Sequence, residues 1–186
     1  MKTNFLKIAV IGLFVFLASK LFPSQYPAPV KGKSIMVGDS HAVGIGSKIK
    51  NIIIDKRIAK GGWRVSNLIN ALNTYPISMD VSRVFISIGT NGQFNSSDNI
   101  LGLIKLLRIK FPNAILYFFG GSYGWSGNEM ISSIEMRFNK YYKRFTDAGV
   151  VQIKNRLGYF RTDADAHSTN SPTAQAIINE ISSIIK

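Results

Sequence analysis

The sequence predicts an α/β protein of three layers, in which helices cover both faces of a five-stranded, parallel, doubly wound sheet. Three observations lead to this fold class. From residue 31 onward, apolar runs of strand length alternate with amphipathic segments of helix length. The runs are continuously apolar, which is typical of strands that are buried on both faces of a parallel sheet. Right-handed crossovers between such strands place the helices on both sides.

Short apolar runs that mostly lead into glycines are predicted as strands, and segments with apolar residues three and four positions apart are predicted as helices. The strands are Ser34–Val37, Ile52–Ala59, Val84–Ile88, Ala114–Phe119 and Val150–Ile153. The helices are Val65–Leu72, Ile100–Ile109, Ile131–Phe145 and a last one that contains Ile177, Ile178, Ile181, Ile184 and Ile185. In such sheets the functional site lies beyond the carboxyl ends of the strands.

The amino terminus is expected to direct export. Lys2 and Lys7 precede the apolar run Ile8–Ala18, which is too short for a full membrane span and suits a secretory signal. A good small-residue cleavage site is missing, so removal and retention as an anchor both stay open. The charge bias places the following domain outside the cytoplasm, as a periplasmic, secreted or membrane-anchored protein. The expected parts are a signal peptide or short anchor (1–22), a proline-rich linker (23–30) and one domain (31–186).

The amino-acid composition argues against several kinds of site and partner. The chain has no cysteine and only two histidines, which argues against disulfides and metal sites, and no cofactor is expected. The net charge of +13 favours anionic partners, such as a cell-envelope surface. The basic residues are scattered, apart from Lys140, Lys143 and Arg144, and no nucleic-acid-binding motif accompanies them. Nucleic acid is therefore not an expected partner.

Four short motifs follow the predicted strands. Gly38-Asp39-Ser40-His41 follows the first, Gly61-Gly62-Trp63 the second and Gly89-Thr90-Asn91 the third, while Asp163-Ala164-Asp165-Ala166-His167 precedes the last helix. A serine at the first position would project from a strand end, close to a helix N-terminus where negative charge is favoured. Taken alone, this serine could equally be a helix N-cap.

With all four motifs in order across residues 34–167, the chain resembles the SGNH (GDSL-like) hydrolases. The resemblance implies a flavodoxin-like sheet of the SGNH-hydrolase type and a serine esterase site. Ser40 would be the nucleophile and His167 its general base, since a serine hydroxyl needs a base within hydrogen-bond reach. The oxyanion would be bound by the N–H groups of Ser40 and Gly62 and by the side-chain amide of Asn91.

The carboxylate expected to orient His167 departs from the family pattern. The family aspartate stands three residues before the histidine, where this chain has Ala164. Asp163 and Asp165 flank that position, and Asp163 is favoured because a tight turn brings residues i and i+4 together. If neither reaches His167, the site is a dyad or is inactive. Gly92 stands where the family often has aspartate, a difference that we interpret as tolerable.

Three further features lie near these motifs. His41 is interpreted as a residue of the cleft wall rather than the base, because adjacent residues on a helix point apart. Ser122 stands in a GxSxG pattern, but Trp125-Ser126-Gly127 intervenes before any helix, so we interpret the segment as a glycine-rich loop. Trp63, Tyr123 and Trp125 could form an aromatic wall for substrate, or simply pack in the core.

These observations lead to two hypotheses of different class. The first is an exported serine esterase that removes acyl groups, most plausibly acetyl, from envelope or surface polysaccharide through an acyl-enzyme. The sequence GDSH also resembles the SGNH domains attached to polysaccharide O-acyltransferases, which points to acylated glycans as substrates; other esters, and transfer of the acyl group, stay open. The second is a non-catalytic SGNH-like module of an envelope assembly or a phage particle, supported by the displaced aspartate.

Overall fold

The computed structural model describes residues 31–124, 130–160, 165 and 167–186. The expected signal peptide or anchor and the proline-rich linker lie outside these residues. Within the described part, no helix has both the length and the apolar character needed to cross a bilayer.

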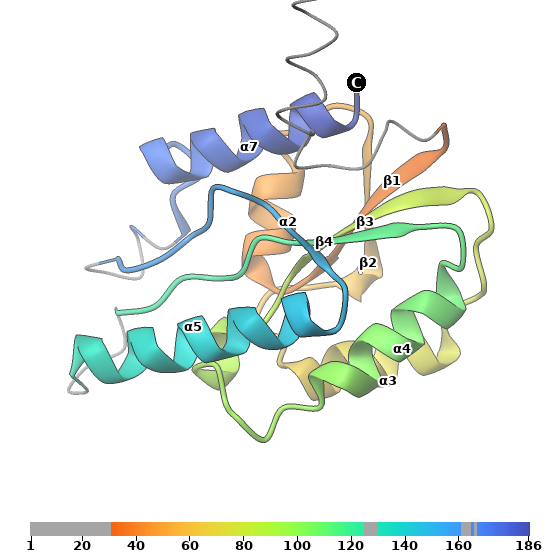
Figure 1. The fold of residues 1–186 in the computed structure, drawn as a ribbon. Coiled ribbons are helices and arrows are strands. Elements are labelled where there is room, and N and C mark those ends of the chain that lie inside the picture. The colour runs from red at the N-terminus through yellow and green to blue at the C-terminus, as the bar shows by residue number, and fades with distance from the viewer. Residues whose placement is uncertain (1–30, 125–129, 161–164, 166) are drawn as a thin grey trace, which may run out of the picture.

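A sheet of five parallel strands forms the centre of the molecule, in the order β2-β1-β3-β4-β5 (Figure 1). The strands are β1 (Lys33–Gly38), β2 (Ile52–Ala59), β3 (Val81–Ser87), β4 (Ile115–Phe118) and β5 (Val151–Gln152). All four neighbouring pairs are parallel, as in the register Ile35–Ile53 and Ile35–Val84. The chain order reverses at β1, which lies between β2 and β3. The predicted doubly wound sheet is thereby confirmed.

Helices cover both faces of this sheet (Figure 1). The helices are α2 (Ser40–Gly46), α3 (Val65–Thr74), α4 (Ile100–Lys110), α5 (Ile131–Asp147) and α7 (Pro172–Ile184), with a 3₁₀ turn η1 at Thr90–Gly92. Helices α2 and α7 pack on one face, and α3, α4 and α5 pack on the other. Each predicted helix is present, with its ends within a few residues of the expected positions.

Two hydrophobic cores, one on each side of the sheet, fix the layers. The central strand β3 feeds both cores, because Val84 and Ile86 face α3, α4 and α5 while Phe85 faces α2 and α7. Every residue of β3 is buried. On the larger side Phe118 stacks on Phe145 of α5, with ring centroids 3.7 Å apart. Burial of one such side chain contributes about 1.5–3 kcal/mol to the free energy of unfolding.

Strand β3 begins three residues before the apolar run that predicted it. Its first residues include Ser82 and Arg83, which are 3% and 5% exposed. The Arg83 guanidinium donates to the Ser82 hydroxyl over 3.3 Å, which supplies a partner inside the protein. Polar residues satisfied in this way extend a strand beyond the apolar pattern that a sequence displays.

Helix α7 is held against the end of β5 by a single carboxylate. Glu180 accepts hydrogen bonds from the backbone N–H groups of Lys154 and Asn155, at 2.6 and 2.8 Å, and from the Asn155 amide at 2.6 Å. The helix begins with Ser171 as N-cap, whose hydroxyl accepts from Ala174 N–H, and with Pro172 in the first turn. These contacts position the loop that precedes α7.

We expect Gly38→Ala to lower the free energy of unfolding by about 2–6 kcal/mol, through backbone strain and overpacking. Gly38 has φ +131°, and an added Cβ would lie 1.7 Å from the carbonyl oxygen of Ser87 on β3. Urea unfolding measures the effect. Gly158→Ala is the matched control, because nothing lies within 4 Å of its added Cβ, and a shift below about 1 kcal/mol is expected there. Equal shifts in the two variants would contradict this account.

Candidate active site

Ser40 stands at the turn between β1 and α2, at the carboxyl edge of the sheet. Gly38 allows the chain to turn with a positive φ, and Asp39 caps α2 by accepting a hydrogen bond from His41 N–H over 3.0 Å. Ser40 is therefore the first residue of the helix and is only partly buried. This edge, where the strand order reverses, is where doubly wound sheets bind ligands.

His167 meets Ser40 across 127 residues of sequence. The Ser40 Oγ lies 3.0 Å from His167 Nε2, which is hydrogen-bond distance. His167 is exposed and precedes α7 in the chain, whereas Ser40 is the first residue of α2 after β1. When Nε2 carries no proton it can accept the hydroxyl hydrogen, which is the relation that a nucleophilic serine needs with a general base.

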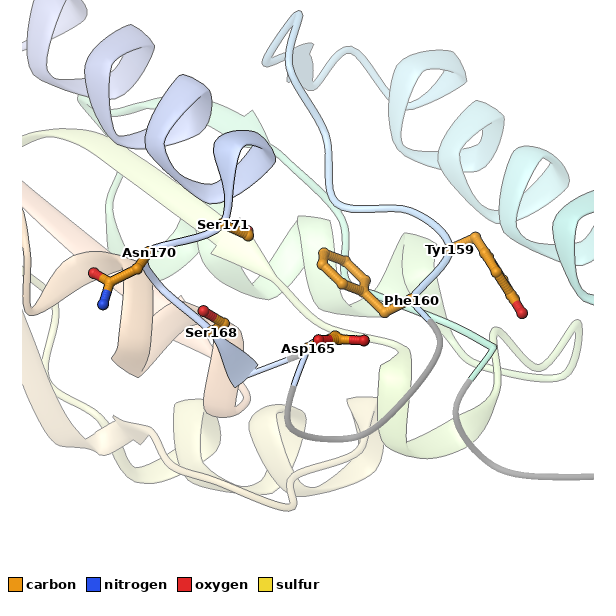
Figure 2. Close-up of a pocket in the computed structure, with 6 residues that line it drawn as sticks. All are labelled: Tyr159, Phe160, Asp165, Ser168, Asn170 and Ser171. Carbon is orange, nitrogen blue, oxygen red and sulfur yellow. The ribbon is translucent and has the colours of Figure 1, made fainter.

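The structure describes only one of the two aspartates that precede His167. Asp163, the favoured partner of His167, lies outside the described residues, as do Ala164 and Ala166. Asp165 is described and exposed, and its backbone carbonyl accepts from Ser168 N–H over 3.2 Å. Its carboxylate lies beside the ring of Phe160 at the wall of a cavity (Figure 2).

The other motifs converge on the same edge of the sheet. An added Cβ at Gly61 would be 3.8 Å from Ser40 Cβ, so the loop after β2 lies next to the serine. Gly62 has φ +78° and open space around its Cα, which lets a ligand approach the backbone closely. Asn91 Nδ2 donates to the carbonyl oxygen of Trp63 over 3.1 Å and so ties η1 to that loop. An amide has two N–H groups, and the second can donate to a ligand.

Of the three aromatic residues considered as a substrate wall, Tyr123 faces the core rather than the solvent. Tyr123 is 7% exposed and packs in the larger core, where Phe94 and Phe138 contact its ring. Burial raises the pKa of the Tyr123 hydroxyl, so the phenol stays neutral near pH 7. Trp63 is partly buried against the same core, and Trp125 lies outside the described residues.

A cavity of about 570 Å³ opens beside the loop that carries His167 (Figure 2). Two aromatic rings, a carboxylate, an amide and two hydroxyls line it: Tyr159, Phe160, Asp165, Ser168, Asn170 and Ser171. Aromatic faces combined with several hydrogen-bonding groups suit a polar ligand with apolar faces. In the described part of the chain, this cavity included, no group of three histidine, aspartate or glutamate side chains could hold a metal ion.

Ser122 of the GxSxG pattern is not a second exposed nucleophile. It is fully buried, and its Oγ lies 2.6 Å from Nε2 of His41. The segment from 119 to 124 is a loop after β4 and does not lead directly into a helix, which agrees with its interpretation as a glycine-rich loop. The pairing with His41 was not expected. Their positions in the sequence could have indicated it, because Ser122 follows β4 and His41 follows β1. The carboxyl ends of these two parallel strands lie at the same edge of the sheet.

Comparison with known proteins gives structural likeness only. No protein-family model matches the sequence, and no curated protein matches it. Among solved structures, phospholipase A1 from Streptomyces albidoflavus NA297 is 15% identical with a TM-score of 0.50, over 66% of this chain and 79% of that one. A protein from Streptococcus pneumonia described under the name platelet activating factor is 12% identical with a TM-score of 0.56, over 99% and 100% of the two chains.

The fold is a three-layer α/β/α sandwich on a five-stranded parallel sheet, and it is the fold of the SGNH/GDSL-type hydrolases. Three of the motifs that resemble this class stand at the carboxyl edge of the sheet, and His167 of the fourth meets Ser40 there.

Proposed function

We propose that this protein is a serine esterase that uses Ser40 as nucleophile and His167 as general base. The observation that carries the proposal is the 3.0 Å distance between Ser40 Oγ and His167 Nε2 at the switch point of the sheet. A serine and a histidine so far apart in sequence have little structural reason to meet in an exposed site. The shared fold with a phospholipase A1 supports ester hydrolysis as the reaction class.

The proposed reaction has two steps. In the first, Ser40 Oγ attacks the ester carbonyl carbon while its proton passes to His167 Nε2, and the same proton then goes to the leaving alkoxide. The oxyanion between these events is bound by the N–H groups of Ser40 and Gly62 and by the Asn91 amide. In the second step His167 takes a proton from water, and the hydroxide formed attacks the acyl-Ser40 carbonyl. Collapse releases the carboxylic acid and returns the proton to Ser40.

The proposed substrate is an acetylated envelope or surface polysaccharide, outside the cytoplasm. The cavity next to His167 supports a sugar, because aromatic rings stack on sugar faces while Asn170 and the two serines can bind hydroxyl groups. The net charge of +13 favours adhesion to an anionic cell envelope. The charged and apolar pattern of residues 1–22 supports export, with attachment to the membrane if this segment is retained.

Labelling with a fluorophosphonate, followed by peptide mapping, tests the nucleophile. We expect label on Ser40, together with release of acetate from acetylated polysaccharide and hydrolysis of 4-nitrophenyl acetate. Absence of label from the folded protein would refute the esterase and favour a non-catalytic binding module. Label on Ser122 would move the nucleophile to the loop after β4. Faster hydrolysis of phospholipid than of acetylated glycan would refute the substrate class and leave the reaction class intact.

Asn91→Ala is expected to lower kcat about 10²–10³-fold with little change in KM, because the lost amide donates to an oxyanion that exists only in the transition state. Steady-state kinetics on 4-nitrophenyl acetate measure the effect. Since Asn91 also donates to Trp63, unfolding in urea is measured in parallel. A loss expressed wholly in KM would make Asn91 a substrate-binding residue instead.

A further inference from the structure

A buried polar array lies directly beneath the proposed site and is not used by the reaction described above. It consists of Asp39, His41 and Ser122, which are 0%, 4% and 0% exposed. Buried ionisable groups are costly unless they are paired, so an array at this place needs an explanation. Asp39 is the N-cap of α2, His41 lies in its first turn, and Ser122 lies in the loop after β4.

The array holds the His41 ring by a hydrogen bond at Nε2, with a longer electrostatic contact at Nδ1. Nε2 lies 2.6 Å from Ser122 Oγ, and Nδ1 lies 3.4 Å from Asp39 Oδ1. The carboxylate next to Nδ1 favours the tautomer with its proton there, so that Nε2 accepts from the Ser122 hydroxyl. Ser122 is itself fixed, since its backbone N–H donates to Thr90 Oγ1 over 3.2 Å. The ring is therefore anchored to β1 and to the loop after β4.

One face of this buried ring lies against His167. The two imidazole rings are stacked, with centroids 5.3 Å apart and planes inclined by 18°. His167 is exposed, whereas His41 is buried in α2 and contacts Asp39 and Ser122. An exposed histidine has several rotamers, and only those that direct Nε2 toward Ser40 suit a general base. A flat, immobile ring beneath it selects among them.

We propose that His41 is a positioning residue for His167: its ring, fixed by Asp39 and Ser122, holds the base with Nε2 toward Ser40. This inference rests on the proposed function, because the stack has a catalytic role only if His167 is the general base. It assigns a role to the histidine that adjoins the nucleophile and to the serine of the GxSxG pattern. In a serine triad an aspartate orients the histidine. Here the stack on His41 supplies part of that orientation of His167, in a chain whose aspartate is displaced from the family position.

Two substitutions test separately the His41 ring and its hydrogen bond to Ser122. His41→Asn removes the ring but keeps a side-chain N–H that can reach Asp39, so the buried carboxylate retains a donor. Ser122→Ala leaves the ring in place and removes its hydrogen bond to Nε2. Ser82→Ala is the matched control, because Ser82 is equally buried but lies at the opposite end of β3. The experiment uses the full chain without a histidine tag.

The first readout is the rate at which a fluorophosphonate labels Ser40, with kcat and KM for 4-nitrophenyl acetate beside it. His41→Asn is expected to slow labelling and lower kcat about 10–100-fold, with KM nearly unchanged, because a displaced base lowers reactivity without changing substrate binding. Ser122→Ala is expected to cause a smaller loss in the same parameter, and Ser82→Ala none. A loss of stability without this change in kcat would show a purely structural role.

The second readout needs no activity. The chain has two histidines, so in His41→Asn every imidazole ¹⁵N signal belongs to His167. In the wild type, at a pH where the ring is neutral, we expect the His167 nitrogens to show one fixed tautomer, with Nε2 unprotonated near Ser40. In His41→Asn we expect the two nitrogen shifts to move toward each other, as the tautomers average. If His41→Asn does not fold, Ser122→Ala provides the test. We then expect the two His167 nitrogen shifts to move toward each other by a smaller amount.

The two readouts distinguish failure of this inference from failure of the proposed function. A labelled wild type with unchanged labelling and His167 spectra in both variants would overturn the positioning role and leave the esterase intact. An unreactive wild type whose His167 signals still move in His41→Asn would refute the esterase and support the stack as the contact that orients His167.

Discussion

Replacing Ser40 by alanine is expected to lower kcat for 4-nitrophenyl acetate by about 10⁶-fold and to abolish fluorophosphonate labelling. Ser122, at the same edge of the sheet, is fully buried and is not expected to take its place. The fold should persist. Ser40 is partly exposed, and the cap of α2 is supplied by Asp39 rather than by the Ser40 side chain.

The control for Ser40→Ala is a serine on the far end of the same helix. Ser47 follows the last residue of α2, and its hydroxyl donates to the Gly44 carbonyl over 2.7 Å. Ser47→Ala should retain the wild-type kcat and lose at most about 1 kcal/mol in the free energy of unfolding. If Ser40→Ala retains activity while folded, the nucleophile lies elsewhere and the proposed site is wrong.

Loss of the carboxylate that orients His167 is expected to slow the chemical step by up to about 10⁴-fold without unfolding the protein. We predict that Asp163→Asn loses most of the activity and that Asp165→Asn keeps most of it. Asparagine keeps the size of the side chain and removes the charge that stabilises the imidazolium. Steady-state kinetics and thermal unfolding of both variants measure the outcome.

The pair Asp163 and Asp165 forms its own internal control, because both residues lie in one short segment before His167. The reverse pattern of losses would assign the role to Asp165. High activity in both variants and in the double variant would show a Ser40–His167 dyad. In that case the stack on His41 would carry a larger share of the orientation, and His41→Asn in the double variant should then cost more than in the wild type.

The fold could be predicted from the sequence because the strands are apolar throughout and the helices show a clear period. Ile52–Ala59 has the predicted bounds in the structure, and the order of helices and strands is as expected. The start of β3 was placed too late, because Ser82 and Arg83 interrupt the apolar run while remaining buried. Backbone pairing with β1 decides that boundary, and pairing is a tertiary property that a single segment does not display.

The sequence predicted those parts of the candidate site that lie in recognisable motifs. Ser40, Gly62 and Asn91 are recognisable from their places after strands, and the structure brings Ser40 and His167 together. The contact of His41 with Ser122 spans 81 residues and involves residue types that are common in loops, so no local pattern marks it. Tyr123 illustrates the same limit. An aromatic residue in a loop beside a site can face the ligand or the core, and here the ring packs in the core.

The distribution of the proposed pair along the chain has a consequence for when activity can appear. Ser40 belongs to the first strand–helix unit of the domain, whereas His167 precedes the last helix. During synthesis the nucleophile is therefore complete long before its base exists, and the base reaches it only after α7 has docked through Glu180. Recovery of Ser40 labelling during refolding should accordingly report the docking of the C-terminal helix, the final event, and not the assembly of the sheet. An incomplete or unfolded chain would thus remain unreactive toward esters.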